Sequence, residues 1–429
     1  MNKHIHMVGI GGIGMSALAQ LYVHVGYVVS GSDRADSPII DLLRGKGVSV
    51  TLDQAHAAVP EQCDLVVCSD AVPEDNPERR QAHERGIRAC SYYEALGEAT
   101  AAGTSIVVSG THGKTTTTAM LAKVLVDAGK NPTVICGSIM SEFGSNFRAG
   151  RSDLFVVEGC EYMRHFLNLH PTIAVVTNIE FDHTDYYEDV ADMQEAFGAF
   201  ITRVPEGGVV VANSELPTVR SVLHHAKAKV APYQETTVPT LQVPGSFNEE
   251  NAHAAKAAAY ALDPELSEEV IDGALAAFTG TWRRFEYKGT TKEGAKVYDD
   301  YAHHPTAVAA TVRAARDAFP GKRLVVAFHP HLYTRTRDFM DEFATALAGA
   351  DEVLLAPIYA AREKPIEGVT SEVLAHKTEA RGTPAHTFDS LRELESFARS
   401  DDCRLTTDTL LITMGAGDIY TVADVLVSN

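Results

Sequence analysis

Short apolar runs alternate with helical patterns along most of this sequence. An apolar run of four to eight residues bounded by turn residues predicts a strand buried on both faces, as in parallel sheets that helices cover on each side. The predicted strands are His6–Ile10, Leu65–Cys68, Ser105–Ser109, Leu154–Glu158, Ile173–Asn178, Leu324–Phe328, Val353–Ala356 and Leu410–Met414. The pattern predicts an α/β fold built on parallel sheets.

The chain is too long for one domain. A single hydrophobic core stops growing at about 250 to 300 residues, and this sequence has 429. A small, polar stretch at residues 99–105 and a change from helical to strand-like pattern at residues 278–289 are the best boundaries. We predict three domains, spanning residues 1–102, 103–280 and 281–429.

Charge and cysteine content exclude several classes of protein. The formal net charge of −20 opposes binding to nucleic acid or to an anionic membrane, and no apolar run approaches the length of a membrane helix. The six cysteines form no CxxC pair, and the N-terminus lacks the features of a secretory signal. We expect a cytoplasmic protein with reduced thiols and no membrane insertion, either a monomer or a homodimer.

The first glycine loop reads "VGIGGIGMSAL". Gly9, Gly11 and Gly14 follow a predicted strand and open a helix in a G-x-G-x-x-G pattern, which is typical of pyrophosphate binding at a helix N-terminus. Asp33 ends the next strand, where a ribose-binding acid is expected. An NAD-dependent dehydrogenase would explain this loop, and a purely structural turn is the other alternative.

A second loop, "SGTHGKTTTT", lies at residues 109–118. It lacks the first glycine of a full P-loop, since residue 108 is valine. The chemistry of a phosphate loop is still present, because Lys114 can neutralise phosphate charge and Thr115 can offer a hydroxyl to Mg²⁺. A GTPase-like switch is one alternative, although the sequence has no N-K-x-D stretch for guanine.

Polar groups follow two later strands of the middle segment. Glu158 ends one strand, and Asn178, Glu180, Asp182 and His183 lie just beyond another. Carboxyl ends of parallel strands meet at one edge of a sheet, so these groups are expected near Lys114. We predict that Thr115, Glu158 and His183 bind a divalent metal ion.

Asn248 and Asn251 have i, i+3 spacing at the start of a helix. They could read an adenine edge together, and helix capping by Asn248 is the simpler alternative.

The last segment repeats the pattern of polar strand ends. Three clusters follow apolar strands and predict a cleft that handles anions; they are Asp299, Asp300, Tyr301, His303 and His304; His329, His331, Tyr333, Arg335 and Arg337; and Gly415, Gly417 and Asp418. Arg283 and Arg284 stand at the second boundary, where they could close on a ligand or form an interdomain salt bridge.

The order of motifs resembles the Mur ligases. The matching stretches are "GIGGIGMS", "GTHGKTTTT", "NIEFDHTDYY", "GSFNEENAHAA", "RRFE", "DDYAHHPT", "HPHLYTRTRDF" and "GAGDI", and they span nearly the whole chain. The resemblance implies an N-terminal Rossmann-like domain for a UDP-sugar, a central ATPase-like domain and a C-terminal Rossmann-like domain. It also implies ATP and Mg²⁺ as cofactors, UDP-N-acetylmuramate and L-alanine as substrates, and an amide bond made through an acyl phosphate.

The resemblance implies a role for each matching residue. ATP binding falls to Gly110, Thr111, His112, Gly113, Lys114, Thr115, Thr116, Asn248, Asn251, Arg284 and Asp300. UDP-sugar binding falls to Gly9, Gly11, Gly12, Ile13, Gly14, Asp33 and Ser69. Amino-acid binding falls to Tyr301, His303, His331 and Arg335, the metal ion to Thr115, Glu158 and His183, and catalysis to Lys114, His183, His303 and Arg335.

Some positions depart from the family pattern. Family members often read E-A-D-E-S-D where this chain has the six residues from Glu158 to Met163, so two acids are missing. Leu332 replaces a common arginine, and Ala307 replaces a frequent acid. The nearest alternative inside the family is a ligase that adds a recycled tripeptide to the same sugar; the compact third segment favours a single amino acid.

Overall fold

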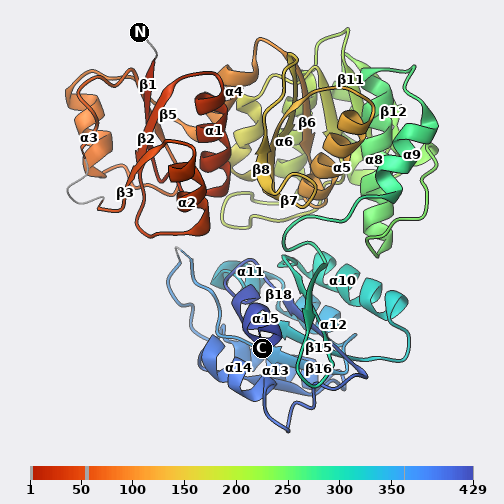
Figure 1. Cartoon of the computed structure of the whole chain (residues 1–429). Coiled ribbons are helices and arrows are strands. Elements are labelled where there is room, and N and C mark those ends of the chain that lie inside the picture. Colours follow the sequence, from red (N-terminus) through yellow and green to blue (C-terminus); the bar gives the residue numbers. More distant parts are fainter. Residues whose placement is uncertain (1–2, 54–57, 362, 429) are drawn as a thin grey trace.

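The computed structural model describes residues 3–53, 58–361 and 363–428, and its three β-sheets follow one another along the chain (Figure 1). Their strands lie within residues 4–91, 104–232 and 286–414. The predicted domain boundaries fall between the sheets and stay a prediction. Most neighbouring strands run parallel, which confirms the predicted α/β class.

The first sheet has the strand order β3-β2-β1-β4-β5 and is parallel throughout. Its strands are β1 His4–Val8, β2 Val28–Ser32, β3 Ser49–Thr51, β4 Leu65–Cys68 and β5 Ala89–Ser91. Its helices are α1 Ile13–His24, α2 Pro38–Gly45, α3 Pro77–Glu84 and α4 Tyr92–Thr100. A capping box starts α4, because Ser91 and Glu94 each accept a hydrogen bond from the other's backbone N–H.

The second sheet has the order β12-β11-β10-β6-β9-β7-β8, with only the edge strand β8 antiparallel to its neighbour. Its strands are β6 Thr104–Ser109, β7 Thr133–Met140, β8 Ser145–Arg148, β9 Leu154–Glu158, β10 Ile173–Val176, β11 Val209–Ala212 and β12 Lys229–Pro232. Its helices are α5 Lys114–Asp127, α6 Val190–Thr202, α7 Pro217–Arg220, α8 Ser246–Leu262 and α9 Glu268–Ala276, with short 3₁₀ helices η1 Tyr162–Asn168, η2 Leu223–His225 and η3 Tyr233–Glu235.

The third sheet has the order β13-β14-β18-β15-β16-β17, with β13 antiparallel to β14. Its strands are β13 Glu286–Thr290, β14 Lys296–Asp300, β15 Arg323–Phe328, β16 Glu352–Leu355, β17 Ala385–Thr387 and β18 Thr409–Met414. Its helices are α10 Pro305–Ala318, α11 Tyr333–Asp338, α12 Met340–Leu347, α13 Ser371–Glu379, α14 Leu391–Ala398 and α15 Tyr420–Val427. No helix in the described part of the chain is both long and apolar enough to cross a bilayer.

Every predicted strand corresponds to an observed one, but β16 ends one residue earlier than expected, and β1 and β10 end two residues earlier. β1 stops at Val8 because Gly9 takes a left-handed conformation (φ +78°), and the N–H groups of Gly9 and Ile10 both turn to the carbonyl of Ser32. β10 stops at Val176 because the residues after it bond to the phosphate loop: the Asn178 carbonyl accepts from the N–H of Thr111, and the Thr177 hydroxyl donates to the carbonyl of His112. Both two-residue differences arise where a strand gives way to a candidate binding loop.

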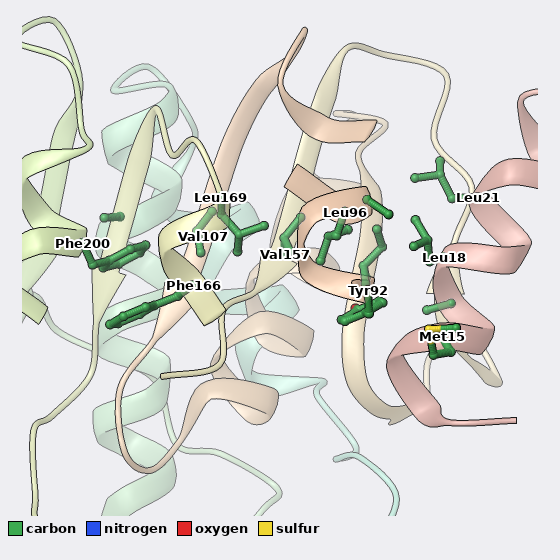
Figure 2. Packing of buried hydrophobic residues seen from close by; sticks show 14 of the residues in the cluster. Met15, Leu18, Leu21, Tyr92, Leu96, Val107, Val157, Phe166, Leu169 and Phe200 are labelled. Atoms are coloured by element: carbon green, nitrogen blue, oxygen red, sulfur yellow. The ribbon is translucent and has the colours of Figure 1, made fainter. Parts of the chain in front are cut away.

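One hydrophobic cluster joins the first two sheets. Figure 2 shows side chains of α1 and α4 packed toward the central sheet, together with residues of β6, β9, η1 and α6; those labelled are Met15, Leu18, Leu21, Tyr92, Leu96, Val107, Val157, Phe166, Leu169 and Phe200. The amide of Gln20 adds a hydrogen bond to Asn146 across the same boundary (3.1 Å). The clusters of the third sheet, by contrast, have their buried members between residues 285 and 426. The first two segments therefore share a core, and the third has its own.

Candidate active site

A cavity of about 1130 Å³ lies where the three segments meet. Its lining includes Ile13 and Tyr92 from the first segment, Lys114 from the phosphate loop, and Tyr301 and Asp418 from the third segment. The loops that reach it follow strands β6, β9, β10, β14 and β18, as expected for ligand binding at the carboxyl ends of parallel strands.

The phosphate loop links β6 to α5 and requires its glycines. Gly113 has a left-handed backbone (φ +84°), and a Cβ atom there would lie 2.2 Å from the amide oxygen of Asn251. Lys114 opens α5, and its ammonium group donates to the loop carbonyls of Gly110 (2.6 Å) and Thr111 (3.0 Å). The ammonium group of Lys114 is therefore hydrogen-bonded to the backbone of its own loop.

Glu161 is the acidic partner of Lys114, and sequence reasoning missed this role. Its side chain is buried and lies 2.8 Å from the lysine ammonium and 3.2 Å from the ring Nε2 of His183. Burial alone would raise the pKa of Glu161, but the charge of Lys114 and the contact with His183 outweigh it and lower that pKa. Burial would likewise lower the pKa of Lys114, and Glu161 reverses this effect, so both groups are charged at neutral pH.

The predicted metal-binding set divides into two parts. The hydroxyl of Thr115 lies 3.0 Å from Glu158, whose second oxygen accepts the backbone N–H of Gly137 (2.7 Å). Thr115 and Glu158 are hard oxygen donors on adjoining elements, so they fit a Mg²⁺ ion. His183 contacts a different carboxylate, that of Glu161.

The asparagine pair lies at the first turns of α8, next to α5. Asn251 is buried, accepts a hydrogen bond from Thr117 (3.2 Å), and donates to Asn248 (3.4 Å). Asn248 is not the helix cap: Gly245 holds that position, and the Asn248 amide donates to the carbonyl of Pro244. The capping alternative is therefore wrong. Asn251 also lines the cavity, as do Thr111, His112, Thr116 and Asp300.

The two arginines at the second boundary have different surroundings. Arg283 is buried and pairs with Asp299 of β14 (2.8 Å), and it also donates to the carbonyls of Gly415 and Gly417. Arg284 reaches the central segment, where it donates to the hydroxyl of Thr115 (3.2 Å). Arg283 therefore contributes to the third segment's own packing, and Arg284 faces the phosphate loop.

The carboxylate of Asp300, at the end of β14, fixes the backbone of the third segment beside the cavity. It accepts hydrogen bonds from the N–H groups of Phe285 and Ala302, both at 2.7 Å. Burial raises its pKa above the usual range despite the nearby charge of Arg284.

Of the residues predicted to bind the amino acid, Tyr301 and His303 line the cavity, whereas His331 and Arg335 do not. Arg335 is buried behind a charged partner. This buried side chain donates to Asp182 of the central segment (2.7 Å) and lies 3.2 Å from the ring Nδ1 of His331. Burial alone would raise the pKa of Asp182, but Arg335 outweighs it and holds that pKa well below its usual range. His303 lines the cavity beside Tyr301, and its Nδ1 lies 2.8 Å from the Tyr301 carbonyl.

The first glycine loop reaches the cavity through its last residues. Ile13 and Gly14, at the start of α1, line the cavity, while Gly12 caps that helix. The carboxylate of Asp33 accepts a hydrogen bond from the N–H of Gly11 (2.7 Å) and so fixes the conformation of the loop. Ser69 packs against Gly9, where an added Cβ would lie 3.0 Å away.

Two departures from the family pattern have clear surroundings. Leu332 is buried with a left-handed backbone (φ +70°), and its N–H donates to the carbonyl of Tyr359 (2.9 Å). Cys160 lines the cavity, and burial raises the pKa of its thiol to about 12. Both positions are therefore uncharged in this chain.

Comparison with known families gives one result along the whole chain. Residues 4–104 match the Mur ligase family catalytic domain, residues 108–239 the Mur ligase middle domain, and residues 283–417 the Mur ligase glutamate ligase domain. The chain belongs to the Mur ligase family. This membership confirms the resemblance, and it contradicts the dehydrogenase and GTPase alternatives that the two glycine loops raised.

Individual Mur ligases are similar over their full length. A UDP-N-acetylmuramate–L-alanine ligase of Salinibacter ruber is 40% identical, covering 99% of this chain and 94% of its own; one of Clostridium botulinum is 37% identical, covering 100% and 98%. The crystal structure of a UDP-N-acetylmuramate–alanine ligase from Thermotoga maritima has a TM-score of 0.82 at 27% identity, covering 99% of this chain and 98% of its own. A murein peptide ligase from Psychrobacter arcticus, at 24% identity, has a TM-score of 0.72 with full coverage of both chains and shares the fold.

Proposed function

We propose that this Mur ligase joins L-alanine to the lactyl carboxylate of UDP-N-acetylmuramate, using ATP and releasing ADP and phosphate, in peptidoglycan precursor synthesis. The full-length similarity to two ligases of that name supports the substrates. The observation that supports the chemistry is the convergence of Lys114, Thr115 and Arg284 on one cavity that all three segments line.

The reaction has two steps. A carboxylate oxygen of the sugar attacks the γ-phosphorus of ATP, and ADP leaves. The amine nitrogen of L-alanine then attacks the acyl carbon, phosphate leaves, and the nitrogen loses a proton as the amide forms.

Charge stabilisation is the main task of the phosphate loop. Lys114 neutralises charge on the transferred phosphoryl group, and the contact of Glu161 keeps its ammonium protonated and in place. Thr115 and Glu158 would hold Mg²⁺, which supplies further neutralisation of phosphate charge when bound. Arg284, from the third segment, contacts the hydroxyl of Thr115 and adds a positive charge beside the phosphate loop.

The acceptor amine would lie between His303 and Arg335. Burial, aided by the charge of Arg335, lowers the pKa of His303 well below its usual range, so its ring is neutral. Because Nδ1 of His303 faces the Tyr301 carbonyl, that atom carries the proton and Nε2 is free to accept a hydrogen bond from the amine. Arg335 and His331 would position the amino-acid carboxylate.

The acceptor assay tests the proposal. The protein is mixed with ATP, Mg²⁺ and UDP-N-acetylmuramate, and ADP release is measured with L-alanine, glycine, L-serine or the tripeptide as acceptor. We expect the fastest release with L-alanine and none without the UDP-sugar. Faster turnover with the tripeptide would assign the chain to the recycling ligase instead.

A further inference from the structure

A second cluster of metal-ligating side chains lies beside the cavity, apart from Thr115 and Glu158. His112, Glu180 and His304 offer two ring nitrogens and one carboxylate oxygen that all lie within 4.8 Å of one another. From this geometry we infer that the three residues form a binding site for a divalent transition-metal ion of the Zn²⁺ or Co²⁺ type, which ties the third segment to the phosphate loop.

Each ligand comes from a different part of the fold. His112 belongs to the phosphate loop, Glu180 to the loop after β10, and His304 to the N-terminal cap of α10. The His112 backbone is fixed, because its N–H donates to Asn178 (2.9 Å) and its carbonyl accepts from the Thr177 hydroxyl (2.6 Å). Two ligands are thus anchored in the central segment, and the third is supplied across the interface.

The His304 ring has its metal-facing nitrogen set by the backbone. Its Nε2 lies 3.1 Å from the carbonyl of Phe181, so Nε2 carries the proton. The Nδ1 lone pair accepts a long hydrogen bond from the N–H of Thr306 (3.4 Å), and a metal ion would take the place of that bond. Metal-binding histidines are commonly oriented in this way by a carbonyl on the other nitrogen. The side chain is only 6% exposed, and Nδ1 lies 3.9 Å from the Glu180 carboxylate, a longer separation than a hydrogen bond.

The remaining distances also suit a shared ion. Nε2 of His112 lies 3.1 Å from the same Glu180 oxygen, and the two imidazole rings are 5.0 Å apart at their centres. Two ligands of a tetrahedral zinc ion are separated by about 3.3 Å, given bonds of about 2.0 Å, so small side-chain rotations bring all three into range.

The ligand set favours a borderline metal over Mg²⁺. Imidazole nitrogens suit zinc, cobalt and nickel, whereas Mg²⁺ prefers oxygen ligands and retains its water. A hollow of about 860 Å³, lined in part by Glu180 and His304, opens next to the cluster and gives an ion a path from solvent. Three protein ligands leave a fourth position for water.

Metal binding to the full-length chain tests the inference. Zn²⁺ is titrated by calorimetry in excess Mg²⁺, and Co²⁺ binding is followed by the intense visible absorption of a tetrahedral ion. Two variants remove ligands with little change of shape: His304→Asn, which keeps a residue able to cap α10, and Glu180→Gln. His224→Gln removes an exposed histidine whose ring packs against that of another histidine, and it is the matched control.

We expect one equivalent of Zn²⁺ and a tetrahedral Co²⁺ spectrum for the unaltered chain and for His224→Gln. His304→Asn and Glu180→Gln should each weaken binding by at least about tenfold, with unchanged circular dichroism. The inference would be overturned if the unaltered chain bound no stoichiometric Zn²⁺, or if both ligand variants bound Zn²⁺ as tightly as the unaltered chain. The result does not depend on the ligase reaction.

Discussion

At the residue scale, several non-glycine residues of the candidate binding loops have a left-handed backbone conformation. His183, Arg283 and Leu332 all have positive φ values although none is glycine. Such conformations cost about 1 to 3 kcal/mol each and persist only where the surrounding structure imposes them. They occur in loops that the sequence already marked as functional, so strain and predicted function coincide there.

The first residue-scale prediction concerns Lys114. Lys114→Ala should lower ligase turnover by roughly 1000-fold or more, because it removes the positive charge that faces the transferred phosphoryl group. Binding of the UDP-sugar, measured by calorimetry, should be largely unchanged, since the first glycine loop lies on another segment. Loss of both properties would argue against separate sites.

The second residue-scale prediction concerns His329, a buried histidine whose ring packs against Gly417. Burial lowers its pKa to about 4, below the value of about 6.5 in an unfolded chain. A lowered pKa means that its contribution to stability is complete above about pH 6.5 and is lost as the pH falls toward 4. This group alone should reduce the free energy of unfolding by about 3 kcal/mol over that range.

Urea unfolding between pH 4 and pH 7.5 measures this effect. His329→Gln should show a flatter dependence on pH than the unaltered chain, whereas His376→Gln, at a side chain that is 81% exposed, should follow the unaltered profile. Parallel profiles for all three proteins would contradict the assignment.

At the element scale, the length of the apolar run decides what can be predicted. The strands predicted from apolar runs all lie inside their sheets, because a strand with both faces buried is apolar along its length; in β6, Val107 packs on one face and Ile106 and Val108 on the other. The interior strands β7 and β11 were not predicted. Short edge strands such as β3, Ser49–Thr51, were missed because no apolar run of sufficient length marks them.

The same limit applies to the site. Strand ends predicted that Lys114, Thr115 and Glu158 would meet, and they do. The role of Glu161 was missed because this residue follows β9 by three residues in an irregular turn. Sequence spacing does not predict in which direction a side chain points in such a turn. Asp182 and Arg335 are 153 residues apart, and no local pattern could have paired them.

One prediction belongs to the helix caps. Ser91→Ala should lower the free energy of unfolding by about 1 kcal/mol, because it removes the capping box of α4. Ser267 also stands at a cap position, that of α9, but its side chain makes no capping hydrogen bond. Ser267→Ala should therefore cost much less, and equal losses in chemical denaturation would show that side-chain capping is not the cause.

At the scale of the whole molecule, the interface of the third segment is more polar than that of the first two. The first and second segments are joined by a continuous apolar cluster. The third reaches the second through the Asp182–Arg335 pair, the Arg284 contact to Thr115 and the His304 contact to Phe181, with the rings of Phe181 and Phe339 beside them. Polar contacts of this kind form and break more readily than an apolar core, so the third segment is expected to move.

The prediction at this scale concerns Asp182. Asp182→Asn removes the charge that faces buried Arg335, so the third segment should swing outward more often, and the radius of gyration from small-angle X-ray scattering should increase. Asp192→Asn is the matched control, because Asp192 pairs with Arg164 inside the central segment. An unchanged radius for Asp182→Asn, or an equal increase for the control, would contradict this role.

The three-sided cavity has a consequence for inhibition. Because its lining is drawn from all three segments, a compound bound in its middle would link the third segment to the core that the first two segments share. The residence time of the compound would then depend on residues between the segments that the compound does not contact. Substitutions that confer resistance would therefore be expected far from the bound compound.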